Sequence, residues 1–153
     1  MKESAPLSIV IGLLVAILGI VGYKLSPMRR QNTDVTLPVS TCSPGLQTCT
    51  LIIPNGRQLD FSMEPLPIRP LQTLRLIVAV SGTGIQKVEV DFDGTEMNMG
   101  YNRVALSENK QQFSGQAILP VCISGTMTWT ATVLLTTETQ RIAVPFHFAV
   151  AGH

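Results

Sequence analysis

An uncharged apolar run over residues 7–23 restricts the fold more than any other feature of the chain. Basic residues flank it, with Lys2 before it and Lys24 and Arg29 after it. A helix rises about 1.5 Å per residue, so the run and its flanks are just long enough to cross a hydrocarbon core about 30 Å thick. The basic segment that follows has no small-x-small cleavage pattern, which favours an uncleaved anchor over a signal peptide. We therefore predict a transmembrane anchor over residues 1–25.

Beyond the anchor, the sequence separates into a short linker and one larger domain. Residues 26–38 are polar and lack apolar periodicity, so we interpret them as the linker. Over residues 39–153, apolar and polar residues alternate in about seven short runs, which Gly, Pro and Asn punctuate. In one run, Leu74, Leu76 and Val78 share a face at period two. The pattern predicts an all-β domain, an immunoglobulin-like antiparallel sandwich of about seven strands.

Charge and motifs argue against two classes of function. The chain has 11 basic and 10 acidic residues and only 5% aromatics, so it has neither a positive surplus for phosphates nor many rings for stacking on bases. Nucleic acid is therefore not an expected partner. The two histidines, His147 and His153, stand in no catalytic motif, and His147 is expected on the outer face of its strand. We expect a protein that is not an enzyme.

Three cysteines, Cys42, Cys49 and Cys122, are candidates for a disulfide or for soft metal ligands. Cys42 and Cys49 enclose six residues that include Pro44 and Gly45, which allow the loop to turn back and bring the sulfurs together. In an oxidising compartment the expected outcome is a disulfide, and a redox-active or metal-binding pair is the alternative. Cys122 is left over as a core hydrophobe, a thiolate ligand, or a partner for one of the other two.

Two methionines two residues apart, Met97 and Met99, form the most specific candidate for a metal site. A thioether is a soft, uncharged ligand that suits Cu(I), and on an extended segment both sulfurs would lie on the same side. Met127, Met63 and Cys122 are candidates for a third ligand. The alternative for all four methionines is ordinary packing, which we favour for Met127 because it continues the apolar face of its strand.

Residues 92–135 resemble small membrane-anchored bacterial proteins of the FixH and YtkA type. The matching elements are the strand end with Met97 and Met99, then Phe113 with Gly115, then Gly125 with Trp129. The resemblance implies one N-terminal helix, a periplasmic immunoglobulin-like domain, and a role in copper supply or cytochrome oxidase assembly. It also implies that the methionine pair binds the metal. This chain differs from that pattern by its three cysteines and by having no histidine beside the methionines.

Signals for the orientation in the membrane conflict. The basic residues after the apolar run would leave the C-terminal domain in the cytoplasm, whereas a disulfide and the domain type fit the periplasm. We give the domain type more weight and expect a single-pass inner-membrane protein with a periplasmic domain. Its expected function is to handle Cu(I) or to assist cytochrome oxidase assembly, beside an oxidase or a copper transporter. The alternative is a metal-free interaction module that docks on a membrane complex through a sheet face or edge.

Overall fold

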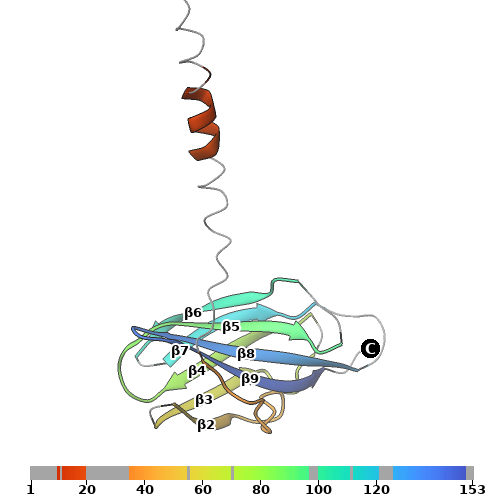
Figure 1. The fold of residues 1–153 in the computed structure, drawn as a ribbon. Coiled ribbons are helices and arrows are strands. Elements are labelled where there is room, and N and C mark those ends of the chain that lie inside the picture. The colour runs from red at the N-terminus through yellow and green to blue at the C-terminus, as the bar shows by residue number, and fades with distance from the viewer. Residues whose placement is uncertain are drawn as a thin grey trace, which may run out of the picture. The chain divides into compact units, whose positions relative to one another are not determined.

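The computed structural model describes residues 10, 12–19, 35–54, 56–69, 71–96, 100–110, 112–120 and 126–150 (Figure 1). The chain divides into two compact units, Met1–Asn32 and Thr33–His153. In the first unit, residues 12–19 are helical and their side chains are exposed. No helix formed by the described residues is both long and apolar enough to cross a membrane. Most of the anchor predicted over residues 1–25 lies outside the described residues.

The second unit is all-β, as the alternating sequence pattern predicts. Its described residues form nine strands in one sheet, in the order β1-β9-β8-β5-β6-β7-β4-β3-β2. Neighbouring strands pair antiparallel, except that β1 and β9 run parallel. The strands are β1 (Val35–Thr36), β2 (Cys49–Ile53), β3 (Arg57–Glu64), β4 (Thr73–Val80), β5 (Ile85–Gly94), β6 (Arg103–Asn109), β7 (Gln112–Ile118), β8 (Met127–Thr137) and β9 (Arg141–Val150).

The structure has nine strands where about seven were predicted, because the sequence pattern missed β1 and β6. In β6 only Leu106 is buried, so no apolar face at period two is visible. β1 has two residues, too few to show any period. It belongs to the domain nevertheless, because it pairs with β9 and the Leu37 N–H donates to the Ala143 carbonyl at 2.9 Å. The linker predicted over residues 26–38 therefore extends too far, since the β domain already includes Val35.

β6 connects two halves of the sheet that pack against each other. Its residues 103–106 pair with β5, whereas residues 107–109 pair with β7. Figure 1 shows the two layers, one containing β5, β8 and β9 and the other containing β3, β4 and β7. The ring centroids of Phe61 in β3 and Phe146 in β9 lie 5.3 Å apart, so the inner faces of the two layers are in contact.

The core consists of the alternating apolar residues that both layers turn inward. Phe92 and Phe148 pack edge to face with centroids 6.3 Å apart, an arrangement that aromatic rings favour. Full burial of a large apolar side chain stabilises a fold by roughly 1.5–3 kcal/mol. The largest fully buried side chains are Trp129, Phe61, Phe92, Phe146, Leu59, Met63, Leu74, Leu76, Leu119, Leu135, Ile142 and Val78.

Pro145 stands inside β9, where a missing N–H would normally interrupt a ladder. The carbonyl oxygens of Ala143 and Pro145 accept hydrogen bonds from the N–H groups of Leu37 and Ser40, at 2.9 and 3.0 Å. This edge of β9 therefore faces residues 37–40. The backbone nitrogen of Pro145 points to the same side as its carbonyl, toward residues 37–40 and away from β8. The hydrogen bonds between β8 and β9 are therefore not interrupted.

Candidate functional site

Two of the methionines proposed as metal ligands lie in the hydrophobic core. Met63, in β3, is 1% exposed and stands opposite Leu76 of β4. Met127, the first residue of β8, is 9% exposed and stands opposite Val150. The burial of Met127 agrees with the packing role that its alternation with Trp129 predicted. Met63 is enclosed by the core, so its sulfur is not available at an accessible rim.

Met97, Met99 and Cys122 lie outside the described residues. The residues before the methionine pair are fixed against β8, because both the N–H and the hydroxyl of Thr95 donate to the Thr128 carbonyl, at 3.1 and 3.0 Å. Thr128 directly follows Met127. The structure therefore places the start of the segment that carries the pair beside the strand end that carries Met127.

The predicted disulfide between Cys42 and Cys49 is confirmed. Their sulfurs are bonded and their Cα atoms lie 5.7 Å apart, within the usual range. The bond ties the segment after β1 to the first residue of β2, and Cys49 is fully buried. Neither sulfur is then a thiolate, so this pair is removed from the candidates for metal ligands.

Histidines and carboxylates add no metal site among the residues that the structure describes. His147 is exposed on the outer face of β9, as its alternation predicted, and stands opposite Thr130 of β8. No group of three or more His, Cys, Asp or Glu side chains in the described part of the chain is placed to hold an ion. His153 lies outside the described residues.

An apolar groove, here called the edge groove, lies between β2, which is one edge strand of the sheet, and the residues that follow β1, the other edge strand. It has a volume of about 300 Å³, and none of its lining residues is charged. β2 is the last strand of the sheet, so one side of its backbone has no neighbouring strand within the described residues. The lining residues are Leu37, Pro38, Val39, Ser40, Thr41, Leu51, Ile52 and Val144.

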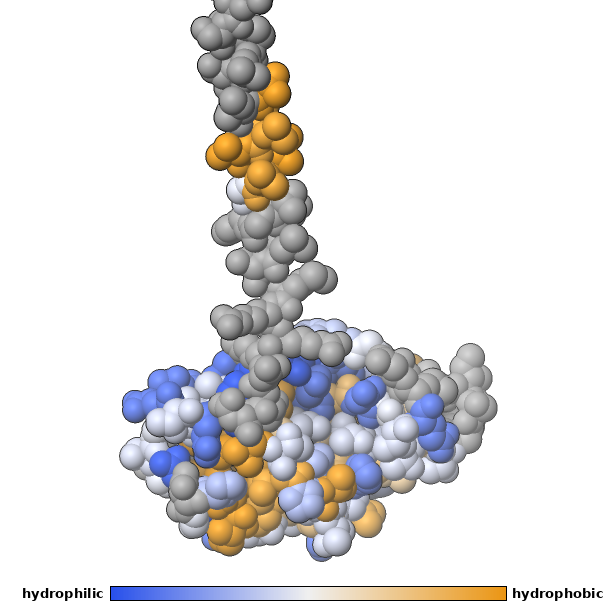
Figure 2. Space-filling model, in the orientation of Figure 1, coloured by the Kyte–Doolittle hydropathy of each residue, from blue (hydrophilic) through white to orange (hydrophobic). Residues whose placement is uncertain are grey.

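Exposed apolar side chains line both walls of the edge groove. Ile52 of β2 is 63% exposed on one wall, and Val39 is 46% exposed on the other. Figure 2 shows that hydrophobic surface gathers around β2 on the face that is visible. Large exposed apolar groups that cluster at an unpaired strand are typical of a surface that contacts another protein.

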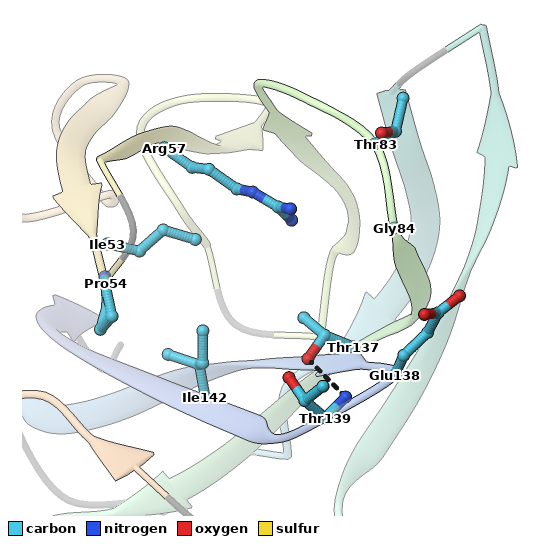
Figure 3. A pocket seen from close by; sticks show the side chains of 9 residues that line it. All are labelled: Ile53, Pro54, Arg57, Thr83, Gly84, Thr137, Glu138, Thr139 and Ile142. Carbon is cyan, nitrogen blue, oxygen red and sulfur yellow. Dashed lines mark hydrogen bonds between the residues drawn. The ribbon is translucent and has the colours of Figure 1, made fainter.

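A second, more polar pocket of about 360 Å³ lies where three turns meet, and we call it the turn pocket (Figure 3). The turns join β2 to β3, β4 to β5, and β8 to β9. The Arg57 side chain reaches into it in Figure 3. This side chain lies beside Gly82 and Gly84, which both have a φ of +90°. The lining residues are Ile53, Pro54, Arg57, Thr83, Gly84, Thr137, Glu138, Thr139 and Ile142.

Charged side chains on the outer face of β5 form ion pairs. Glu89 is 7% exposed and lies 2.9 Å from Lys87 Nζ and 3.6 Å from Arg141 Nη2. Arg103 Nη2 donates to Asp91 at 3.0 Å, and this hydrogen bond raises the pKa of Arg103. Because the pKa of Arg103 is raised in the folded protein, the charge of Arg103 stabilises the fold fully at pH values below the ordinary pKa of arginine. This contribution is lost only as the pH rises through the raised pKa of Arg103. The Arg103 contribution is therefore constant at neutral pH.

Sequence reasoning missed both the edge groove and the turn pocket. Gly, Pro and Asn at residues 54–56 and Gly at residues 82 and 84 are among the residues that punctuate the predicted strands, but Arg57 carried no signal of its own. A cation directly after a predicted turn is common on protein surfaces. Only the order of the strands in the sheet brings Arg57 next to turns that lie far away in the sequence.

No family model matches the sequence, and no curated protein matches it. Among solved structures, the chain is similar to a DUF4785 family protein from Legionella pneumophila, with 14% sequence identity and a TM-score of 0.44. The similarity covers 63% of this chain and 28% of the Legionella chain, so this chain spans little more than a quarter of that protein.

Proposed function

We propose that this chain is a single-pass protein of the bacterial inner membrane whose periplasmic domain is a metal-free protein-interaction module. The apolar run over residues 7–23 supports the anchor. The Cys42–Cys49 disulfide supports the periplasm, because disulfides form and persist in oxidising compartments.

We also propose that the β domain is an immunoglobulin-like sandwich. In that fold, two antiparallel sheets pack face to face with Greek-key connections. The pairing of β4 with β7 in one layer, and of β5 with β8 and β8 with β9 in the other, fits this arrangement. The contact between Phe61 and Phe146 across the layers supports it further.

The edge groove is the observation that carries the interaction function. An edge strand presents unpaired backbone N–H and C=O groups, to which an extended segment of another protein can add as a further strand. The groove beside β2 is apolar and has no charged lining residue. We therefore propose that its occupant is an extended, uncharged segment of a membrane-protein partner, with apolar side chains at alternate positions.

Photo-crosslinking in intact membranes tests this surface. A photoreactive residue replaces Ile52 in the full chain, and the matched control replaces Ile118, which is 54% exposed on the outer face of β7 away from both sheet edges. We expect one discrete crosslinked species from position 52 and none from position 118. The same species should disappear when Val39 on the opposite wall becomes lysine.

Equal crosslinking from both positions, or a crosslink that is insensitive to Val39→Lys, would exclude the edge groove as the docking surface. The Val39→Lys variant should keep the melting temperature of the parent chain, because Val39 is already 46% exposed. This control is needed because a variant that unfolds would also lose the crosslink.

A second candidate function is the handling of Cu(I) in the service of cytochrome oxidase assembly. It is favoured by the hydrogen bonds of Thr95 to Thr128, which start the Met97 and Met99 segment beside Met127. Cys122 and Met127 remain candidates for a third ligand, whereas Met63 is too deeply enclosed. Thioethers suit Cu(I) in a compartment where free thiols are oxidised.

Titration of the full chain with Cu(I), against a chromophoric chelator, tests this second function. This second function predicts one-to-one Cu(I) binding that is lost in the Met97→Leu/Met99→Leu variant and kept in Met63→Leu, a matched change at a buried methionine. Binding that survives the double change, or no competition with the chelator by the unmodified chain, would reject a site at the methionine pair.

A further inference from the structure

We propose that the turn pocket binds a carboxylate group, with Arg57 as the residue that recognises it. This inference does not rest on the edge groove or on copper. The pocket lies between the three turns and is lined by different residues from the edge groove. The Arg57 guanidinium points into the opening between these turns in Figure 3.

The Arg57 side chain lies along the glycine loop and has no charged partner among the described residues. A β-carbon built on Gly82 would lie 3.5 Å from Arg57 Nε and 3.8 Å from its Cδ, so the side chain lies directly along the glycine loop. No ion pair or hydrogen bond to the Arg57 side chain occurs among the described residues. A guanidinium presents its N–H groups in a planar fork that matches a carboxylate in two parallel hydrogen bonds.

The charges of the lining favour a singly charged anion over a doubly charged one. Arg57 and Glu138 are the two charged lining residues, and the others are neutral, so the net charge of the lining is zero. A doubly charged phosphate would gain from Arg57 but would be repelled by Glu138, which stands on the exposed rim. A carboxylate carries one negative charge and has the planar shape that the guanidinium fork prefers.

The remaining lining can accommodate a ligand larger than the carboxylate itself. Pockets that hold small ligands have volumes of about 300–1,000 Å³, and this one has about 360 Å³. Thr137 is already engaged, because its hydroxyl donates to the Gln140 carbonyl at 2.8 Å and accepts from the Gln140 N–H at 3.1 Å. The neighbouring hydroxyls of Thr83 and Thr139 make no hydrogen bond within the described part of the chain and are free to contact the bound molecule.

Titration with sodium acetate, followed by NMR, tests the proposal on the full chain in detergent micelles. Ionic strength is held constant with sodium chloride, and the amide signals of Gly82 and Gly84 are observed. We expect saturable shifts at both glycines that are lost in Arg57→Gln. They should persist in Arg75→Gln, a control that removes an exposed arginine from the outer face of β4.

Two further variants make the outcome specific to the charges. Arg57→Lys keeps the charge but loses the planar fork, so acetate should bind more weakly than to the parent chain. Glu138→Gln removes the repulsion at the rim, so affinity should rise by about two- to fivefold, the range expected for exposed charges. Inorganic phosphate should bind more weakly than acetate to the parent chain, and this preference should shrink in Glu138→Gln.

The proposal is overturned if acetate shifts neither glycine, or if Arg57→Gln keeps the shifts while its melting temperature matches the parent. Phosphate binding more tightly than acetate would also overturn it. Triglycine with a free C-terminal carboxylate, compared with triglycine amide, distinguishes two sources of the same group. Tighter binding of the free peptide than of acetate indicates a peptide C-terminus, whereas equal affinity indicates a small-molecule carboxylate.

Discussion

Position 115 in β7 is a glycine, and the absence of a side chain there allows β6 to pass very close. A β-carbon built there would lie 2.6 Å from Leu106 Cδ2 and 3.3 Å from Val104 Cγ1. Contacts this short require neighbouring side chains or the strand itself to move. A larger residue at position 115 would therefore require the Leu106 side chain to move at the place where β6 crosses between the two layers.

We predict that Gly115→Ala lowers the free energy of unfolding by about 1–3 kcal/mol, the usual range for overpacking a core. Urea unfolding of the full chain, followed by the fluorescence of the single tryptophan Trp129, gives this value. In a Leu106→Ala background the added loss should be smaller, because the closest contact is gone. Strictly additive losses would show that the two residues do not interact.

At the scale of elements, the strands that have one buried and one exposed face were predictable from sequence. β4 and β8 bury alternate residues, and this alternation is visible in the letters alone. β6 was not predictable in the same way, since it changes partner halfway along its length and buries only Leu106. Its place in the sheet depends on pairing with β5 and β7, which a local pattern does not record.

The disulfide that closes the loop between Cys42 and Cys49 is expected to stabilise the folded domain. We predict that Cys42→Ala/Cys49→Ala lowers the free energy of unfolding by about 2–3 kcal/mol, chiefly because the unfolded chain regains the freedom of a short loop. Urea unfolding under non-reducing conditions measures the difference. As a control, Cys122→Ala should keep the disulfide, and a loss of the disulfide in that variant would contradict the Cys42–Cys49 pairing.

At the scale of the whole molecule, the candidate sites depend on contacts that sequence spacing does not reveal. The methionine pair was found by its local pattern, and the disulfide by the short loop between its cysteines. The turn pocket instead joins Arg57 to the turn at residues 137–139, and the edge groove joins residues 37–41 to β2. Strand order determines both, so only the folded domain could show them.

The most direct test of the proposed docking is hydrogen–deuterium exchange over β2 in the full chain. Exchange is compared between native membranes and purified protein in detergent, with a Cu(I) chelator present in both. We predict that the amides of Cys49–Ile53 that point away from β3 exchange about tenfold more slowly in native membranes, because new backbone hydrogen bonds at this edge would contribute about 1.4 kcal/mol. Exchange in β6 should be unchanged. Equal exchange of β2 in both preparations would contradict a partner strand at the edge groove.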